Sequence, residues 1–226
     1  MELHSTKIKR NSNLKRSNYH LYKRQIVICF CNITWRKFIF GEVEKMKKSI
    51  AVIFQGTGYT CEEQLLVGCA KKYAAFGYDI VKIDFSEIPF REIETIKEAV
   101  EIAKPILLTQ LKKIDFKNYD NVVFISKSFG TICAGWLEEY LSIMPQQIFL
   151  TPIEETLPYV KKSSRIIGMV VGTEDRLMNY NFLKSYCAEK NIPCIVFNSV
   201  GHSLKYENYP EKTNAINEQI YNLCRV

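Results

Sequence analysis

The chain has 226 residues, of which 47% are apolar and 24% are charged, with only 10 Gly and 7 Pro. This composition is typical of one compact globular domain and excludes a disordered or fibrous chain. No apolar run approaches the roughly 18 to 20 residues that a membrane-spanning helix needs, so we expect no membrane partner.

The net charge of +7 belongs entirely to the N-terminal fifth of the chain. Residues 1–45 hold 10 Lys or Arg and 3 Asp or Glu, whereas residues 46–226 hold 21 of each sign. Because this larger part is neutral, it shows no electrostatic preference for a polyanion. We therefore expect no nucleic-acid partner for residues 46–226.

Residues 1–45 form a basic N-terminal extension. Its apolar run at 25–35 is not followed by a small-x-small cleavage site, which argues against a signal peptide. Met46 directly precedes the first strand-like segment, and residues 41–45 can be encoded by an almost purine-only stretch, as a bacterial ribosome-binding site is. We expect translation to start at Met46 and residues 1–45 to be non-native or disordered. A basic tail for a nucleic acid or a membrane surface is the alternative.

From residue 46 onward, short apolar segments alternate with segments of helical periodicity. Apolar segments of strand length predict six strands, at 49–55, 78–84, 121–126, 147–150, 165–171 and 193–198. Continuous apolar strands that alternate with helices are typical of a parallel sheet covered on both faces. The sequence therefore predicts an α/β domain over residues 46–226, with three α/β/α layers and a mostly parallel sheet of about six strands.

Helix signals fall between these strands. Thr60 and Glu63 have the spacing of a capping box, which predicts a helix from there to Phe76, ended by Gly77. Because Pro105 cannot donate within a helix, 93–114 is predicted to be a helical hairpin or a kinked helix. Further helices are predicted at 130–144, at 181–190 and from Pro210 to about 224.

The chain contains eight cysteines, six of them after residue 46, and none of these six forms a CxxC pair or a metal-ligand spacing. Most lie in apolar stretches, where Cys behaves as a small hydrophobic residue. We expect reduced thiols, a cytoplasmic location, and neither a metal nor a cofactor.

The first candidate for chemistry is Ser128, which follows the third predicted strand and precedes a helix. A tight strand-to-helix turn needs small residues two positions before and after its apex, and Ser126 and Gly130 supply them. The usual pattern is G-x-S-x-G, so Ser126 is a departure from it. An ordinary helix start is the alternative interpretation.

A serine nucleophile needs a base, and the base needs a carboxylate to orient it. His202, directly after the sixth strand, is the only His after residue 46. Asp175 follows the fifth strand and is one of five Asp in the chain, with Glu174 as the neighbouring alternative. A lone loop histidine and a turn or capping aspartate are the plainer interpretations. Because ligands bind beyond the carboxyl ends of parallel strands, the shared edge favours a triad of Ser128, Asp175 and His202.

Acyl transfer also needs backbone N–H groups that stabilise the developing oxyanion. The residue after the nucleophile, Phe129, is expected to supply one of them. The loop after the first strand, with Gly56 and Gly58, is expected to supply the other, because its glycines let the backbone approach a substrate.

On these residues the chain resembles the α/β-hydrolase family, in particular its small, nearly lidless dienelactone hydrolase-like members. The resemblance spans about residues 48–224 and depends on Q-G-T-G at 55–58, S-K-S-F-G-T at 126–131, G-T-E-D at 172–175 and G-H-S at 201–203. It implies a minimal α/β-hydrolase fold lacking the family's first two strands. It also implies Ser128 as nucleophile, His202 as base, Asp175 as its orienter, and the N–H groups of Thr57 and Phe129 as oxyanion donors.

The expected function is a serine hydrolase that cleaves a small ester, thioester or related acyl compound. One alternative is a non-catalytic binding or sensor module on the same fold. Another is a Rossmann-type dinucleotide-binding protein, with glycines at 56 and 58 and Asp84 for a ribose, although Cys61 replaces the third glycine.

The segment 151–164 is too short for a large lid, so we expect a small, open pocket. Its candidate lining residues, each of which is equally a core candidate, are Tyr59, Phe129, Pro152, Ile153 and Leu177. Lys127 and Arg176 are expected either to meet an anionic substrate or to be solvated.

Overall fold

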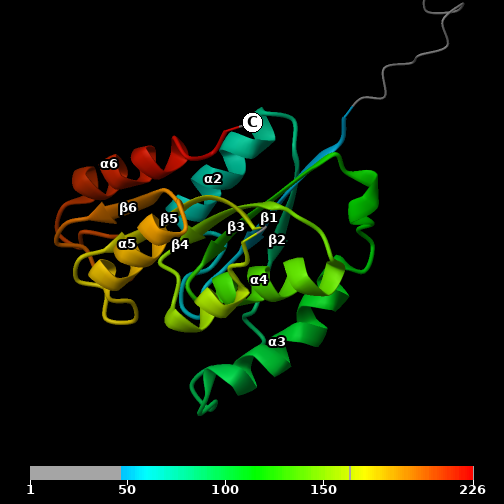
Figure 1. Ribbon diagram of the computed structural model, residues 1–226, viewed down its shortest axis with the longest axis horizontal. Helices are drawn as coiled ribbons and strands as arrows, with labels where there is room; N and C mark the ends of the chain where they lie inside the picture. Colours follow the sequence, from blue (N-terminus) through cyan, green and yellow to red (C-terminus); the bar gives the residue numbers. More distant parts are fainter. Residues whose placement is uncertain (1–46, 163, 226) are drawn as a thin grey trace, which may run out of the picture. The chain divides into compact units, whose positions relative to one another are not determined.

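The computed structural model describes residues 47–162 and 164–225 (Figure 1). The predictions made for residues 1–45, including the translation start at Met46 and the basic tail, lie outside the described residues. Within the described ranges, no helix combines the length and the apolar character needed to cross a membrane.

A parallel sheet of six strands, in the order β2-β1-β3-β4-β5-β6, forms the middle layer. The predicted strands are confirmed to within one residue at each end. Their bounds are β1 (Ser49–Phe54), β2 (Asp79–Ile83), β3 (Asn121–Lys127), β4 (Gln146–Leu150), β5 (Arg165–Gly172) and β6 (Cys194–Phe197).

Helices cover both faces of the sheet, which confirms the predicted three-layer α/β/α class (Figure 1). One face carries α3 (Ile96–Leu111), α4 (Phe129–Leu141) and α5 (Tyr180–Glu189), and the other carries α2 (Gln64–Ala75) and α6 (Pro210–Tyr221). Two short 3₁₀ helices, η1 (Phe116–Asn118) and η2 (Glu154–Tyr159), lie in the connections before β3 and β5.

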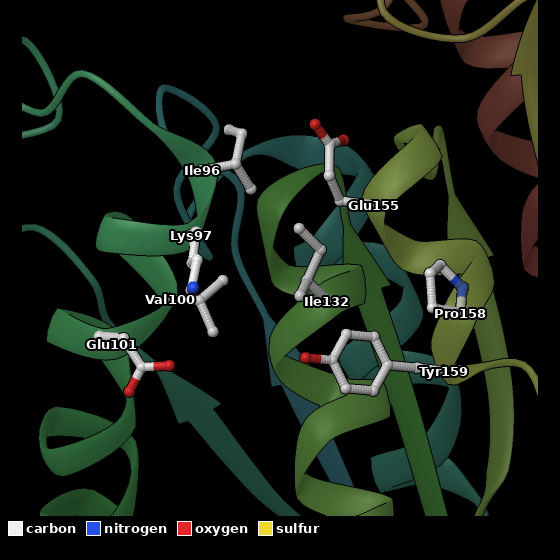
Figure 2. A pocket seen from close by; sticks show the side chains of 8 residues that line it. All are labelled: Ile96, Lys97, Val100, Glu101, Ile132, Glu155, Pro158 and Tyr159. Atoms are coloured by element: carbon white, nitrogen blue, oxygen red, sulfur yellow. The ribbon is translucent and has the colours of Figure 1, made fainter.

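Between α3, α4 and η2 the packing leaves a cavity of about 350 Å³ (Figure 2). Ile132 of α4 lies between walls contributed by α3 and η2, as the close-up shows. The lining is mainly apolar, with charged side chains from both walls, and consists of Ile96, Lys97, Val100, Glu101, Ile132, Glu155, Pro158 and Tyr159.

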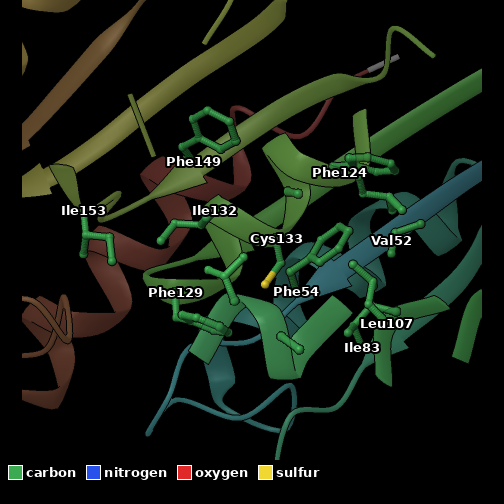
Figure 3. Close-up of a cluster of buried hydrophobic side chains, with 14 of the residues drawn as sticks. Val52, Phe54, Ile83, Leu107, Phe124, Phe129, Ile132, Cys133, Phe149 and Ile153 are labelled. Atoms are coloured by element: carbon green, nitrogen blue, oxygen red, sulfur yellow. The ribbon is translucent and has the colours of Figure 1, made fainter. Parts of the chain in front are cut away.

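The core on this face of the sheet is rich in aromatic side chains (Figure 3). Phe54 of β1 packs edge-on against Phe124 of β3, with ring centroids 5.2 Å apart. Phe129, at the start of α4, packs against Phe85 and Phe90 of the β2–α3 connection, with centroids 5.6 and 5.1 Å away. The start of α4 is therefore packed against the β2–α3 connection.

Two sequence predictions about helices need correction. The capping box is wrong, because α2 begins only at Gln64 and the side chain of Glu63 caps nothing. Glu63 instead pairs with Lys205 at 2.6 Å, and Cys61 is held in the loop by the carbonyl groups of Ile53 and Ile83. The hairpin alternative for 93–114 is also wrong, because α3 continues through Pro105 as one helix.

The strand order shows the place where open α/β sheets usually bind a ligand. From β1 the chain moves outward to β2, and from β3 it proceeds in the opposite direction to β6, so the order reverses between β1 and β3. These two strands are direct neighbours, with Phe54 of β1 in register with Ser126 of β3. In open α/β sheets the crevice at such a switch point, outside the carboxyl ends of the strands, is the usual ligand site.

Candidate active site

Ser128 joins β3 directly to α4 in an unusual backbone conformation. Its φ is 51° and its ψ is −123°, a region that residues with a Cβ rarely adopt and that costs on the order of 1–3 kcal/mol. Surrounding hydrogen bonds maintain this turn: the Ser128 N–H donates to the Leu150 carbonyl at 3.0 Å, and the Ser128 carbonyl accepts from the Thr131 N–H at 2.8 Å. The turn presents the Ser128 side chain at the carboxyl edge of the sheet.

The small residues on either side of Ser128 are not equivalent. A Cβ at Gly130 would lie 2.4 Å from the Gln55 carbonyl oxygen, so only glycine fits there. Ser126, in contrast, has room for its side chain, which is fully buried and donates to the Ile148 carbonyl at 3.4 Å. The departure from G-x-S-x-G at residue 126 is therefore accommodated by the fold.

The structure brings Ser128, His202 and Asp175 into one hydrogen-bonded chain. His202 Nε2 lies 2.7 Å from Ser128 Oγ, and His202 Nδ1 lies 2.8 Å from Asp175 Oδ2 and 3.0 Å from Oδ1. The Asp175 side chain is fully buried and that of His202 is 24% exposed. An ionised carboxylate accepts the Nδ1–H, which leaves Nε2 to accept the proton of the serine hydroxyl.

The loops that carry the acid and the base are locked together. A Cβ at Gly172 would lie 1.9 Å from the Val200 carbonyl oxygen, so the loops after β5 and β6 touch at that point. The Glu174 N–H donates to the same carbonyl at 3.0 Å. Glu174, the alternative acid, is exposed, and it is Asp175 that contacts His202.

The predicted oxyanion loop lies against Ser128. A Cβ at Gly56 would lie 3.2 Å from Ser128 Cβ, so this glycine permits the close approach. Its own N–H donates to the Tyr59 carbonyl at 3.0 Å. Phe129 is the first residue of α4, a position whose N–H has no partner within the helix. Thr57 is exposed, and a Cβ at Gly58 would meet nothing within 4 Å, so residue 58 needs no glycine for space.

The expectations for Lys127 need correction. The side chain is neither solvated nor available to a substrate, because the residue is only 1% exposed. Its Nζ donates to the backbone carbonyl of His202 at 2.7 Å and to Thr151 Oγ1. Sequence reasoning missed this role because a lysine at the end of a strand normally extends into solvent. Its position next to Ser128 was the only signal.

One hollow borders this chain of residues at His202, and a second lies one helical turn along α4 from Ser128. One, of about 590 Å³, is lined by Glu174, Arg176, Gly201 and His202. The other is the cavity of Figure 2, whose Ile132 follows Ser128 by one turn of α4. A hydrogen bond between Thr131 and Thr156 joins the start of α4 to η2 beside that cavity. Of the candidate lining residues, Tyr59, Phe129 and Ile153 are instead buried in the two cores.

Asp84 and the glycine loop, the candidates for dinucleotide binding, have other roles in the structure. The Asp84 carboxylate accepts from the Ser86 N–H at 2.8 Å and from Gln55 Nε2 at 3.2 Å, and the bonds from Ser86 lower the pKa of Asp84. The helix after the glycine loop begins only at Gln64. A pyrophosphate site needs that helix N-terminus directly beside the glycines, so this geometry disfavours the dinucleotide alternative.

Comparison with known proteins agrees with this topology. No protein-family model and no curated protein sequence matches the chain. Several solved structures do, each covering 78–79% of the chain. A serine hydrolase homologue from Coxiella burnetii is 16% identical with a TM-score of 0.55, over 86% of its own length. Est1E from Butyrivibrio proteoclasticus, with ferulic acid bound, is 14% identical with a TM-score of 0.56, over 90%.

A Pyrococcus furiosus esterase is 13% identical with a TM-score of 0.53, over 82% of its length. The chain therefore has the α/β-hydrolase fold.

Proposed function

We propose that the chain is a serine hydrolase that cleaves a small ester, thioester or related acyl substrate. The observation that supports this most directly is the hydrogen-bonded chain from Ser128 Oγ through His202 to the buried Asp175 carboxylate. A hydroxyl 2.7 Å from an imidazole nitrogen is within reach of proton transfer, which activates an otherwise weak nucleophile.

In the proposed acylation step, Ser128 Oγ attacks the carbonyl carbon while its proton moves to His202 Nε2. The carbonyl π electrons move onto oxygen and form a tetrahedral oxyanion. Collapse of this intermediate reforms the carbonyl and breaks the bond to the leaving group, which takes the proton from His202. Asp175 stabilises the imidazolium through the Nδ1–H and stays ionised throughout.

Deacylation repeats the sequence with water. His202 removes a proton from a water molecule that attacks the acyl carbon, and Ser128 Oγ then leaves and regains a proton from His202. The products are a carboxylic acid and the free enzyme.

The N–H groups of Phe129 and Thr57 are the proposed oxyanion donors. The Phe129 N–H belongs to the first turn of α4, whose N–H groups have no partner within the helix, and the Thr57 N–H belongs to the loop that Gly56 brings against Ser128. Backbone donors fixed in place at a site of developing charge stabilise the transition state without having to reorganise. Loss of one such donor costs about 10²–10³ in turnover.

The two hollows support a small substrate with an apolar part. The cavity of about 350 Å³ suits an apolar group, and the charged mouth at Glu174 and Arg176 suits the polar end.

The direct test is covalent labelling of the 226-residue chain with a fluorophosphonate, read by intact mass and peptide mapping. We expect one adduct, on Ser128, that is absent from Ser128→Ala and nearly absent from His202→Ala. Hydrolysis of p-nitrophenyl acetate should fall by about 10⁴-fold or more in both variants, because the triad acts as a unit. A folded wild-type chain without an adduct would contradict the proposal and favour a non-catalytic binding module.

A further inference from the structure

Lys127 is the only lysine or arginine that is buried within residues 47–162 and 164–225. It ends β3 and immediately precedes Ser128. Burying a charged ammonium costs free energy unless it is fully hydrogen-bonded, and an apolar side chain of similar volume often costs less. A lysine at this position therefore calls for an explanation beyond packing.

The Lys127 ammonium has two hydrogen-bond acceptors and one aromatic neighbour. The acceptors are the carbonyl oxygen of His202, at 2.7 Å, and Thr151 Oγ1. The ammonium also lies over the ring of Tyr59, whose centroid is 5.0 Å from Nζ. Burial lowers the pKa of Lys127 to about 7, a shift that the Asp175 carboxylate opposes and Lys205 reinforces. The charged groups around Nζ thus come from the loops after β5 and β6.

These contacts converge on the loop that carries His202. Both ends of that loop have positive φ values on residues other than glycine, 52° at Ser199 and 56° at Leu204. Such a conformation persists only where tertiary contacts hold it. Lys127 supplies such a contact at the backbone of His202 itself. It links that backbone to the end of β3, directly before Ser128, and through Thr151 to the residue after β4.

We propose that Lys127 is a positioning residue that holds the His202 imidazole in line between Ser128 and Asp175. This inference rests on the proposed function for its catalytic consequence, but the positioning itself is a property of the folded chain. The lysine does not touch the substrate. Its backbone is joined covalently to Ser128, and its ammonium donates to the backbone carbonyl of His202. Lys127 thereby fixes the distance between the nucleophile and the base.

The first test replaces the ammonium and retains the volume. In Lys127→Met we expect the kcat for p-nitrophenyl acetate and the rate of fluorophosphonate labelling to fall roughly 10- to 100-fold, as about 1 Å of misplacement does. KM should stay unchanged, because the lysine does not contact the substrate. The thermal midpoint should be equal to or above that of the wild type, because an unfavourable buried charge is removed.

Two further variants separate positioning from general damage. Thr151→Val removes one acceptor of Nζ and leaves the lysine, so we expect a smaller fall in kcat with the same KM. Lys205→Met is the matched control. Lys205 lies over the same Tyr59 ring, with Nζ 4.9 Å from the centroid, but its hydrogen bond goes to Glu63. It should react at the wild-type rate.

A nuclear magnetic resonance readout makes the test independent of catalysis. In histidine-labelled wild-type protein, the Nδ1–H of His202, assigned by its loss in His202→Ala, should be protected from exchange by Asp175. In Lys127→Met this protection should drop.

If the wild type is not labelled by fluorophosphonate but the protection still drops, the proposed function fails and the positioning role stands. Wild-type protection in both Lys127→Met and Thr151→Val would overturn the inference. Wild-type kcat in both variants would likewise overturn it.

Discussion

The two edges of the sheet handle unusual backbone conformations in different ways. At the edge where strands begin, positive φ values occur at Gly77, Ser142 and Asn191, each just past the end of a helix. There the left-handed residue ends the helix, which is an ordinary local role for Gly and Asn. At the edge where strands end, positive φ values occur at Ser128, Thr151, Ser199 and Leu204.

No helix C-terminus explains the second group. It includes a β-branched residue and a leucine, which adopt this region at a cost. Ser128 contacts His202, Thr151 contacts Lys127, and Ser199 and Leu204 flank the His202 loop. Strain of this kind persists where surrounding contacts determine the geometry. Tertiary contacts therefore set the backbone at the carboxyl edge, whereas local contacts set it at the opposite edge.

The largest effect on stability is expected at Gly130, at the carboxyl edge. Gly130→Ala should destabilise the chain by about 3 kcal/mol or more, or prevent folding, because the new Cβ meets backbone oxygen that cannot move aside. The matched control at the other edge is Gly77→Ala. There φ is +82° and nothing lies within 4 Å of the new Cβ, so the cost should be only about 1–2 kcal/mol. Urea unfolding measures both, and equal losses would contradict the contrast between the edges.

An intermediate effect is expected of pH on the free energy of unfolding, through Lys127. The pKa of Lys127 is about 7 in the folded chain against an ordinary value of 10.5, so above pH 7 the unfolded chain binds more protons at this residue. The destabilisation caused by the buried Lys127 charge should therefore be greatest below pH 7. Between about pH 7 and 10.5 this destabilisation should shrink, so that the free energy of unfolding rises by at most about 1.4 kcal/mol per pH unit.

The measurement is the difference in unfolding free energy between wild type and Lys127→Met from pH 6 to 9. Taking the difference cancels the thiols and tyrosines that both proteins share. The groups facing Nζ, namely Asp175, His202, Lys205 and Tyr59, also stay in both proteins. A difference that does not change with pH would show that Lys127 does not titrate in this range.

The smallest effect is expected at Ser126. Ser126→Gly restores the G-x-S-x-G pattern but removes the hydrogen bond from the Ser126 hydroxyl to the Ile148 carbonyl. Glycine also increases the backbone entropy of the unfolded chain. We expect a loss of about 1 kcal/mol in stability with an unchanged labelling rate at Ser128, since the tight contact is at Gly130. A faster reaction would mean that Ser126 restrains the turn.

Much of this fold follows from the sequence, because the central strands β1, β3 and β5 contain continuous apolar runs that can be recognised without long-range information. The strand-end positions of Ser128, Asp175 and His202 follow in the same way, and their catalytic role stays a prediction. The capping box failed because Glu63 pairs with Lys205, 142 positions away in the sequence. The burial of Lys127 could not be predicted for the same reason, since the loop around His202 covers it.

The contact between Gly172 and the Val200 carbonyl determines which loops of this chain can accept insertions during evolution. Because the acid and base loops share that contact, a residue inserted in either of them would separate the pair. The connection from β2 to α3 starts at the same carboxyl edge of the sheet but is outside that contact. For the proposed hydrolase, new substrate preferences are therefore accessible through lengthening the β2–α3 connection, while Ser128, His202 and Asp175 keep their spacing.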